Sequence, residues 1–143
     1  MLREGRQKYP RRSAPDERRV AMKWLTKTIG RERRALERAR RRFVERPTEK
    51  RLHDVRTAGR RFRSLLEDVA AVETCERLRH RVKRAAATTD AARDATIVRR
   101  LLEESVEESE AAIAEPLLEE LRERENLATH RARQRLRRMR FDC

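Results

Sequence analysis

The sequence predicts an all-α protein, folded as an antiparallel bundle of four to five helices. The 143 residues include only 3 Gly and 4 Pro, too few for a turn-rich β sandwich or barrel. Leu, Ile, Val and Phe together number 28, a fraction close to that of disordered chains, yet these residues recur at helical spacing. Short connections between the long amphipathic stretches favour antiparallel neighbours. We therefore expect one helical domain at 13–143, preceded by a flexible basic arm at 1–12.

The first helix is expected over residues 15–46. Ser13 is a candidate N-cap, and acidic residues follow it in the first turn. Gly30 lies inside this stretch and allows a kink, whereas Pro47 ends the helix. Large apolar residues recur every seven positions and define a buried face: Met22, Ile29, Leu36 and Phe43.

The second helix, expected over residues 49–71 after the N-cap Thr48, has the clearest apolar stripe. The members of this stripe step by three or four positions: Leu52, Val55, Gly59, Phe62, Leu66 and Val69. A glycine within a buried stripe indicates close approach of a neighbouring helix. Gly59 is therefore expected to lie against another helix.

Three further helices are expected after residue 74. The third is capped by Thr74 and carries Leu78, Val82, Ala85 and Ala86. A turn at 88–90 is expected to separate it from a fourth helix, capped by Asp90, that fades in the acidic run 103–110. That fourth helix carries Ile97, Val98, Leu101 and Leu102. A fifth starts or kinks near Pro116, with an apolar face made of Leu117, Leu118, Leu121, Ala128, Ala132, Leu136 and Met139.

Charge is abundant and unevenly distributed. The net charge is +14, and 34 of the 39 basic residues are Arg. Residues 1–64 hold 23 basic and 8 acidic side chains, whereas residues 101–125 hold 2 and 10. Such segregation favours a polyanionic partner, because the local field attracts anions. Solvated helix faces in an arginine-biased sequence are the alternative.

The second expected helix also carries the most ordered polar pattern, the row His53, Arg56, Arg60 and Arg63. Its spacings of three, four and three place the row on one side of the helix, roughly 110° from the apolar stripe. Like charges at these spacings repel one another, and few acids lie near enough to relieve them. The row therefore favours a bound polyanion over a merely solvated face.

Other chemistries find little support in the sequence. The three histidines and two cysteines have no metal-site spacing, and neither a P-loop, a Gly-rich phosphate loop nor a nucleophile elbow is present. We expect no enzyme activity, no cofactor and no metal. No apolar run approaches the roughly 18 residues of a membrane span. We expect a soluble, cytoplasmic protein.

The segment 52–66, with the sequence LHDVRTAGRRFRSLL, resembles the signature of the conserved-histidine α-helical domain (CHAD) family. The family pattern is an apolar residue, His, two residues, Arg, three residues, Arg-Arg, an apolar residue and Arg. Segments 82–95 and 117–141 resemble later helices of that domain. A complete domain has two similar bundles, and this chain resembles the first half only. Residue 90 is Asp where the family usually has Gly, and residue 59 is Gly where a larger residue is common.

The resemblance implies a non-catalytic module that binds inorganic polyphosphate, with association to polyphosphate or polyhydroxyalkanoate granules. It also implies which side chains make the contacts: His53, Arg56, Arg60, Arg61, Arg63, Lys83 and Arg93. Arg61 lies off the row, so pairing with an acid is its alternative role. Because the chain spans one half of the domain, we expect a homodimer that rebuilds the two-lobed site.

Two other functional classes stay open. One is a nonspecific nucleic-acid binder that uses the basic arm and the arginine rows, although aromatic residues for base stacking make up only 3% of the chain. The other is a structural or interaction protein, in which the acidic segment 103–125 meets the basic face of another copy. A competition experiment between polyphosphate and DNA distinguishes a nucleic-acid binder from a polyphosphate binder.

Overall fold

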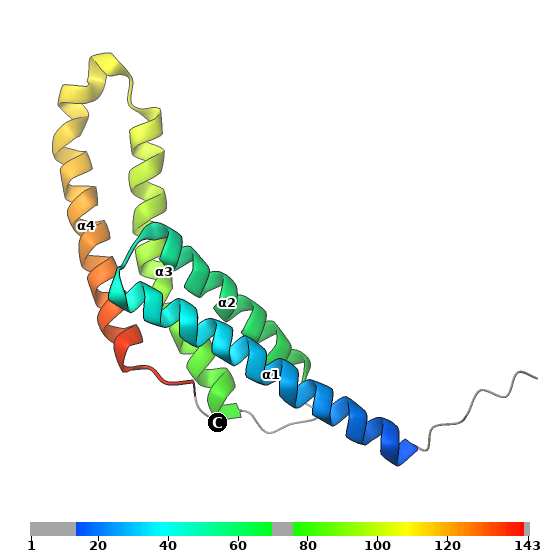
Figure 1. The fold of residues 1–143 in the computed structure, drawn as a ribbon. Helices are drawn as coiled ribbons and strands as arrows, with labels where there is room; N and C mark the ends of the chain where they lie inside the picture. Colours follow the sequence, from blue (N-terminus) through cyan, green and yellow to red (C-terminus); the bar gives the residue numbers. More distant parts are fainter. Residues whose placement is uncertain (1–13, 70–75, 142–143) are drawn as a thin grey trace, which may run out of the picture.

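The computed structural model describes residues 14–69 and 76–141, and within these ranges it is entirely helical apart from short connections (Figure 1). The α helices are α1 (Ala14–Glu45), α2 (Glu49–Asp68), α3 (Glu76–Ser105) and α4 (Ala111–Arg138), and a short 3-10 helix, η1 (Glu108–Glu110), precedes α4. The predicted all-α bundle is confirmed. The basic arm at 1–12 and the candidate caps Ser13 and Thr74 lie outside the described residues.

The four helices form two hairpins of unequal length. Helices α1 and α2 make the first hairpin, and it packs across one end of the longer hairpin formed by α3 and α4 (Figure 1). The other end of the long hairpin, around η1, extends beyond the first. Thr48 begins α2 as expected, since its hydroxyl accepts a hydrogen bond from the Arg51 N–H at 3.3 Å. The helix α1 is continuous over Gly30.

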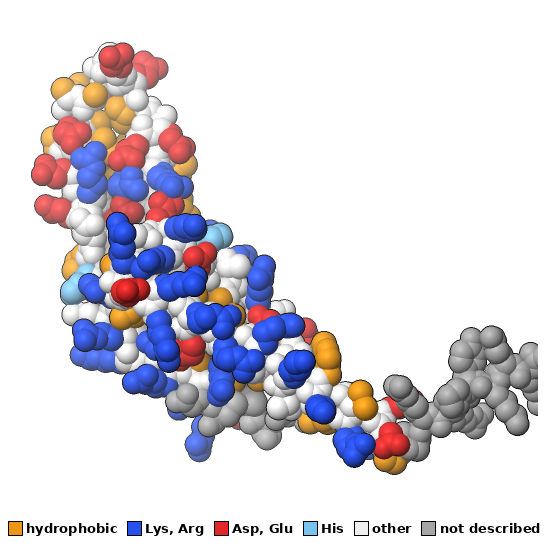
Figure 2. All heavy atoms as spheres, in the orientation of Figure 1, with side chains coloured by type: hydrophobic (Ala, Val, Ile, Leu, Met, Phe, Trp, Pro, Cys, Tyr) orange, Lys and Arg blue, Asp and Glu red, His pale blue; other side chains and the backbone are white. Residues whose placement is uncertain are grey.

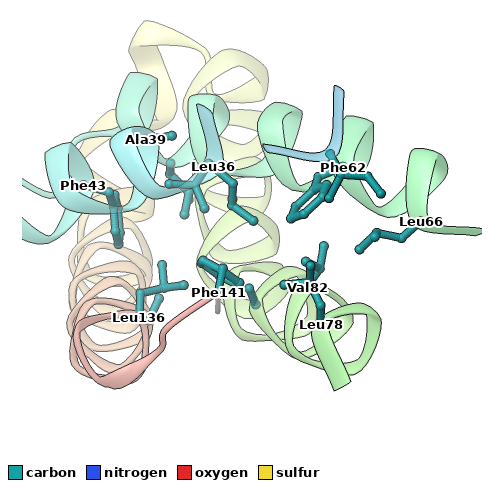
Figure 3. Close-up of a cluster of buried hydrophobic side chains, with 14 of the residues drawn as sticks. Leu36, Ala39, Phe43, Phe62, Leu66, Leu78, Val82, Leu136 and Phe141 are labelled. Carbon is teal, nitrogen blue, oxygen red and sulfur yellow. The ribbon is translucent and has the colours of Figure 1, made fainter. Parts of the chain in front are cut away.

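A single apolar cluster joins all four helices. All six members of the stripe predicted for α2 are buried. Figure 3 shows Phe43, Phe62, Leu136 and Phe141 directed into the same cluster, and each of these side chains is fully buried. The side chain of Leu36 lies beside Gly59 as expected, but a Cβ at this glycine would stand 3.9 Å from Leu36, which is an ordinary contact. Close helix approach therefore does not require glycine there.

The predicted turn at residues 88–90 is wrong, because α3 runs through it without a break. The Thr88 hydroxyl donates to the carbonyl four residues earlier, and the Thr89 hydroxyl donates to the carbonyl three residues earlier, each at 2.8 Å. Both hydroxyls thus donate hydrogen bonds within the helix, and neither residue forms the turn that its type favours. Asp90 does not cap a helix; its carboxylate instead accepts a hydrogen bond from Arg56 at 2.6 Å.

The apolar faces expected for three helix segments are also wrong in part. Met22 near the start of α1 is 39% exposed, and Leu101 near the end of α3 is 61% exposed. Ile97, Val98 and Leu117 are exposed as well. The cause lies in the unequal hairpins, since helical spacing identifies a face but not whether another helix lies along it. The fifth predicted helix, α4, begins at Ala111, five residues before Pro116.

Candidate anion-binding surfaces

Several arginines serve the fold itself rather than a ligand. Arg40 is 5% exposed; its Nε donates to the Glu37 carboxylate at 2.9 Å and its Nη1 donates to the Leu136 carbonyl at 3.0 Å. Arg133 on α4 donates to the Val44 carbonyl at 2.7 Å. Both carbonyls belong to the last turn of a helix, and that of Leu136 also accepts the Met139 N–H at 3.2 Å. These two guanidinium groups therefore act as helix C-caps that tie α1 to α4.

The groove between α2 and α3 collects three of the residues proposed from the sequence. It has a volume of about 190 Å³, and its basic lining residues are His53, Arg56, Arg93 and Arg100. Arg56 donates to the Thr89 hydroxyl at 3.1 Å and forms an ion pair with Asp90 at 2.6 Å. Arg100 pairs with Glu49 across the groove at 2.7 Å. We call this the α2–α3 groove; it is basic but partly neutralised.

A second groove lies on the other side of His53, between α1 and α2. Its volume is about 380 Å³, and its basic lining residues are Arg38, Arg42, His53 and Arg61. Glu32 and Asp54 line it as well. Arg61, which lay off the sequence row, therefore faces α1 rather than α3, and it forms no ion pair with the described residues. We call this the α1–α2 groove, and His53 stands on the ridge between the two grooves.

The remaining predicted ligands do not join these grooves. Arg63 pairs with Glu67 at 2.7 Å, and both side chains are about half exposed. Arg60 and Lys83 are exposed; within the described ranges neither forms an ion pair, and neither lines the α2–α3 groove or the α1–α2 groove. The expectation that few acids relieve the row is wrong in part: Glu67, just beyond the row, pairs with Arg63, and Asp90 from α3 pairs with Arg56. Helix spacing showed the row but not Asp90, which arrives from another helix.

A third groove, larger than the other two, was not predicted. It lies between α3 and the end of α4, has a volume of about 740 Å³, and contains five arginines. These are Arg81, Arg84, Arg135, Arg138 and Arg140. Part of the signal lies in the basic run 130–138, which supplies Arg135 and Arg138. Nothing in the sequence showed that Arg81 and Arg84, about fifty residues earlier, face the same space.

The extended end of the long hairpin is acidic, unlike the three basic grooves. Figure 2 shows acidic side chains gathered toward the end around η1, while Lys and Arg cover the opposite part of the visible face.

In the α3–α4 interface, the Glu125 carboxylate accepts hydrogen bonds from Arg99 and, at 2.7 Å, from Thr96. Burial alone would raise the pKa of Glu125, but these hydrogen bonds outweigh burial and lower it. The carboxylate therefore stays ionised and holds the two helices together.

A scan against protein-family models found no match, and searches of the curated proteins and of the solved structures found none either. The resemblance to the CHAD family stays a prediction from the residues quoted above. In the described part of the chain, no group of three or more His, Cys, Asp or Glu side chains is arranged to hold a metal ion. None of the described helices is long and apolar enough to cross a membrane.

Proposed function

We propose that the protein binds inorganic polyphosphate, without catalysis, across the exposed side of α2. The observation that carries this proposal is the position of His53 between two basic grooves. Basic side chains from three helices meet there: Arg38 and Arg42 from α1, Arg61 from α2, and Arg93 and Arg100 from α3. This arrangement supports an extended ligand that crosses the ridge, rather than a compact ligand confined to one groove.

The chemistry of arginine supports the same proposal. A guanidinium presents a planar set of donors that matches phosphate oxygens, and it keeps its charge at any relevant pH. Arg60 and Arg61 are the cations of α2 best able to take a phosphate, because neither is engaged by an acid among the described residues. Arg56 contributes only if the ligand competes with Asp90, whose side chain is 56% exposed and therefore able to move away.

The test replaces Arg60 and Arg61 together by Ala. Arg56 is left intact, because removing it would also strip Thr89 and Asp90 of their partner and change stability. The control replaces Arg131 and Arg137 by Ala, which removes the same charge from exposed positions of α4 outside all three grooves. Titration with long-chain polyphosphate at fixed salt measures the affinity of each protein.

We expect the Arg60→Ala/Arg61→Ala protein to bind about tenfold more weakly or worse, since each lost charge-assisted contact is worth on the order of 1.5 kcal/mol. The control should change less than about twofold, and wild-type affinity should fall steeply with salt. Equal losses of affinity in both variants would mean that only the overall electrostatic field attracts polyphosphate, and the α2 surface would be rejected as the binding site. Displacement of polyphosphate by DNA at low phosphate excess would favour the nucleic-acid alternative.

The proposal includes pairing of two copies and an intracellular, granule-associated location. Exposed apolar side chains on the free end of the long hairpin favour self-association, among them Leu101 and Ile113. Charge segregation along the molecule favours the alternative arrangement, in which the acidic end meets the basic end of another copy. The two arrangements differ in salt dependence, because apolar pairing persists at 1 M salt whereas pairing of opposite charges does not.

A further inference from the structure

Large apolar side chains of the described residues stay exposed in two regions that lie far apart. One is the first part of α1, where Val20 is exposed and Trp24 is 64% exposed. The other is the part of the long hairpin between 97 and 127, where Leu117 is exposed and Ile113, close to η1, is 83% exposed. The start of α1 and the η1 end of the hairpin stand at opposite ends of the molecule (Figure 1). They therefore cannot cover each other within one copy.

The charges around these two regions are opposite in sign. Segment 18–31 of α1 contains five basic residues and no acidic one, whereas segment 103–120 contains eight acidic residues and no basic one. Arginines of the hairpin outside that acidic segment pair with three of its acids: Glu103, Glu115 and Glu120. The acids nearest η1 keep the negative field at the end of the hairpin, as Figure 2 shows. Opposite fields attract unlike ends of two copies, and like fields oppose the pairing of two η1 ends.

The two surfaces also match in spacing. The α1 stripe consists of two exposed apolar residues and one cation, separated by four and three positions: Val20, Trp24 and Lys27. The η1 stripe has two exposed apolar residues and one anion with the same separations in the opposite direction: Leu117, Ile113 and Glu110. The members of each stripe lie within roughly 60° of one another around a helix. Antiparallel packing of the two stripes therefore puts apolar on apolar twice and cation beside anion once.

We propose that the α1 stripe of one copy docks antiparallel on the η1 stripe of a second copy. In this register Trp24 packs on Ile113, and Lys27 faces Glu110. Trp24 is the anchor, since buried tryptophans carry much of the binding energy of protein interfaces. The contact is head-to-tail, so one stripe of each kind stays free in a dimer and further copies can add to a chain. This inference rests on the self-association included in the proposed function, and it does not depend on polyphosphate binding.

Two variants, each lacking one stripe, test the arrangement. The α1 variant is Val20→Ser/Trp24→Ser, and the tip variant is Ile113→Ser/Leu117→Ser; all the replaced side chains are exposed. Circular dichroism establishes that each variant folds, and Trp24→Ser or Ile113→Ser alone takes the place of a double variant that does not. A head-to-tail contact needs one stripe of each kind, so we expect each variant alone to be monomeric in light scattering and their equimolar mixture to form a dimer. Pairing of two η1 ends would instead leave the α1 variant dimeric, and mixing would not rescue the tip variant.

The fluorescence of Trp24 reports the same contact, because Trp24 is the only tryptophan of the chain. The α1 variant lacks it, so the signal of the mixture comes from the tip variant alone. We expect the emission of the tip variant to shift to shorter wavelength as the α1 variant is added, with about tenfold weaker binding at roughly 1 M salt than at roughly 0.1 M. The Arg60→Ala/Arg61→Ala protein should assemble as the wild type does, which separates a failure of assembly from a failure of polyphosphate binding.

Three results would overturn the proposal. The first is a mixture that stays monomeric at about 0.2 mM of each variant, where even weak pairs form. The second is an α1 variant that dimerises alone. The third is a shift of the Trp24 emission that appears only with anionic lipid vesicles, which would assign the α1 stripe to a membrane surface.

Discussion

Replacing Arg40 by Met should destabilise the protein more than any loss of a surface arginine. The guanidinium of Arg40 is buried, and it joins the Glu37 carboxylate at 2.9 Å to the Leu136 carbonyl at 3.0 Å. Methionine matches most of the volume of the side chain but none of its donors. The substitution therefore removes the cation that pairs with the Glu37 carboxylate and one of two donors to the Leu136 carbonyl, which keeps only the Met139 N–H.

The size of the loss follows from this geometry. Breaking a buried ion pair by removing one partner costs about 3–5 kcal/mol, because the remaining charge is left uncompensated. The Glu37 side chain is 21% exposed, so water reaches it in part and the lower end of that range, about 3 kcal/mol, applies. For a chain of this size, that loss corresponds to a drop of about 10 °C in the melting temperature. Urea unfolding measured by circular dichroism gives the free energy directly.

The double variant Arg40→Met/Glu37→Leu is the control that separates charge from packing. Each single substitution leaves one unpaired group, whereas the double removes both, so its cost should be about 2 kcal/mol less than the sum of the single costs. Some loss remains, because Glu37 also accepts the Phe141 N–H. Strict additivity, or a single Arg40→Met cost below about 1 kcal/mol, would refute the view that this pair is a buried anchor between α1 and α4.

Three further outcomes are expected. Gly59→Ala should stabilise the protein by about 0.5–1 kcal/mol in urea unfolding, because alanine favours the helix and a Cβ there meets its nearest neighbour at 3.9 Å; a loss of stability would mean that the helices are closer than described. Burial alone would raise the pKa of Glu125, but the hydrogen bond from Arg99 helps to lower it below 4.5, so the stability from this carboxylate is complete above pH 4.5 and disappears as the pH falls through the lowered pKa. Glu125→Gln should therefore destabilise the protein at pH 7 and flatten its acid unfolding profile, and an unchanged profile would contradict this role. The double substitution Leu101→Ser/Ile113→Ser should convert a dimer to a monomer in light scattering, whereas a wild-type protein that is itself a strict monomer would refute pairing.

The sequence predicted the fold class because the apolar spacing of α2 is complete. Leu52 through Val69 recur at helical intervals on a short helix, and a packed partner lies along its whole length. The prediction of a turn at 88–90 failed because it used only the local preferences of these residues and not the helix that contains them. Thr88 and Thr89 favour a turn in isolation, but hydrogen bonds from both hydroxyls to carbonyls of the preceding turn keep them in α3.

The candidate sites were predicted less completely, and for a physical reason. A helical wheel places residues of one helix on a common face, so it found His53, Arg56 and Arg60. It carries no information about side chains that arrive from other helices, such as Asp90, which neutralises Arg56 across the α2–α3 groove. The groove between α3 and the end of α4 is built from residues that lie far apart in the sequence, and no single helix displays it.

The net charge of +14 therefore overstates the charge available to a polyanion. A guanidinium whose donors already face a helix-end carbonyl has fewer of them free to turn toward phosphate oxygens. Arg51 and Arg133 are engaged in this way at the end of α1, and Arg40 is so engaged at the end of α4. Affinity depends on the arginines that neutralise phosphates and release their counterions. If the proposed function is correct, the arginines of α2 without an acidic partner among the described residues set binding, whereas the capping arginines set stability.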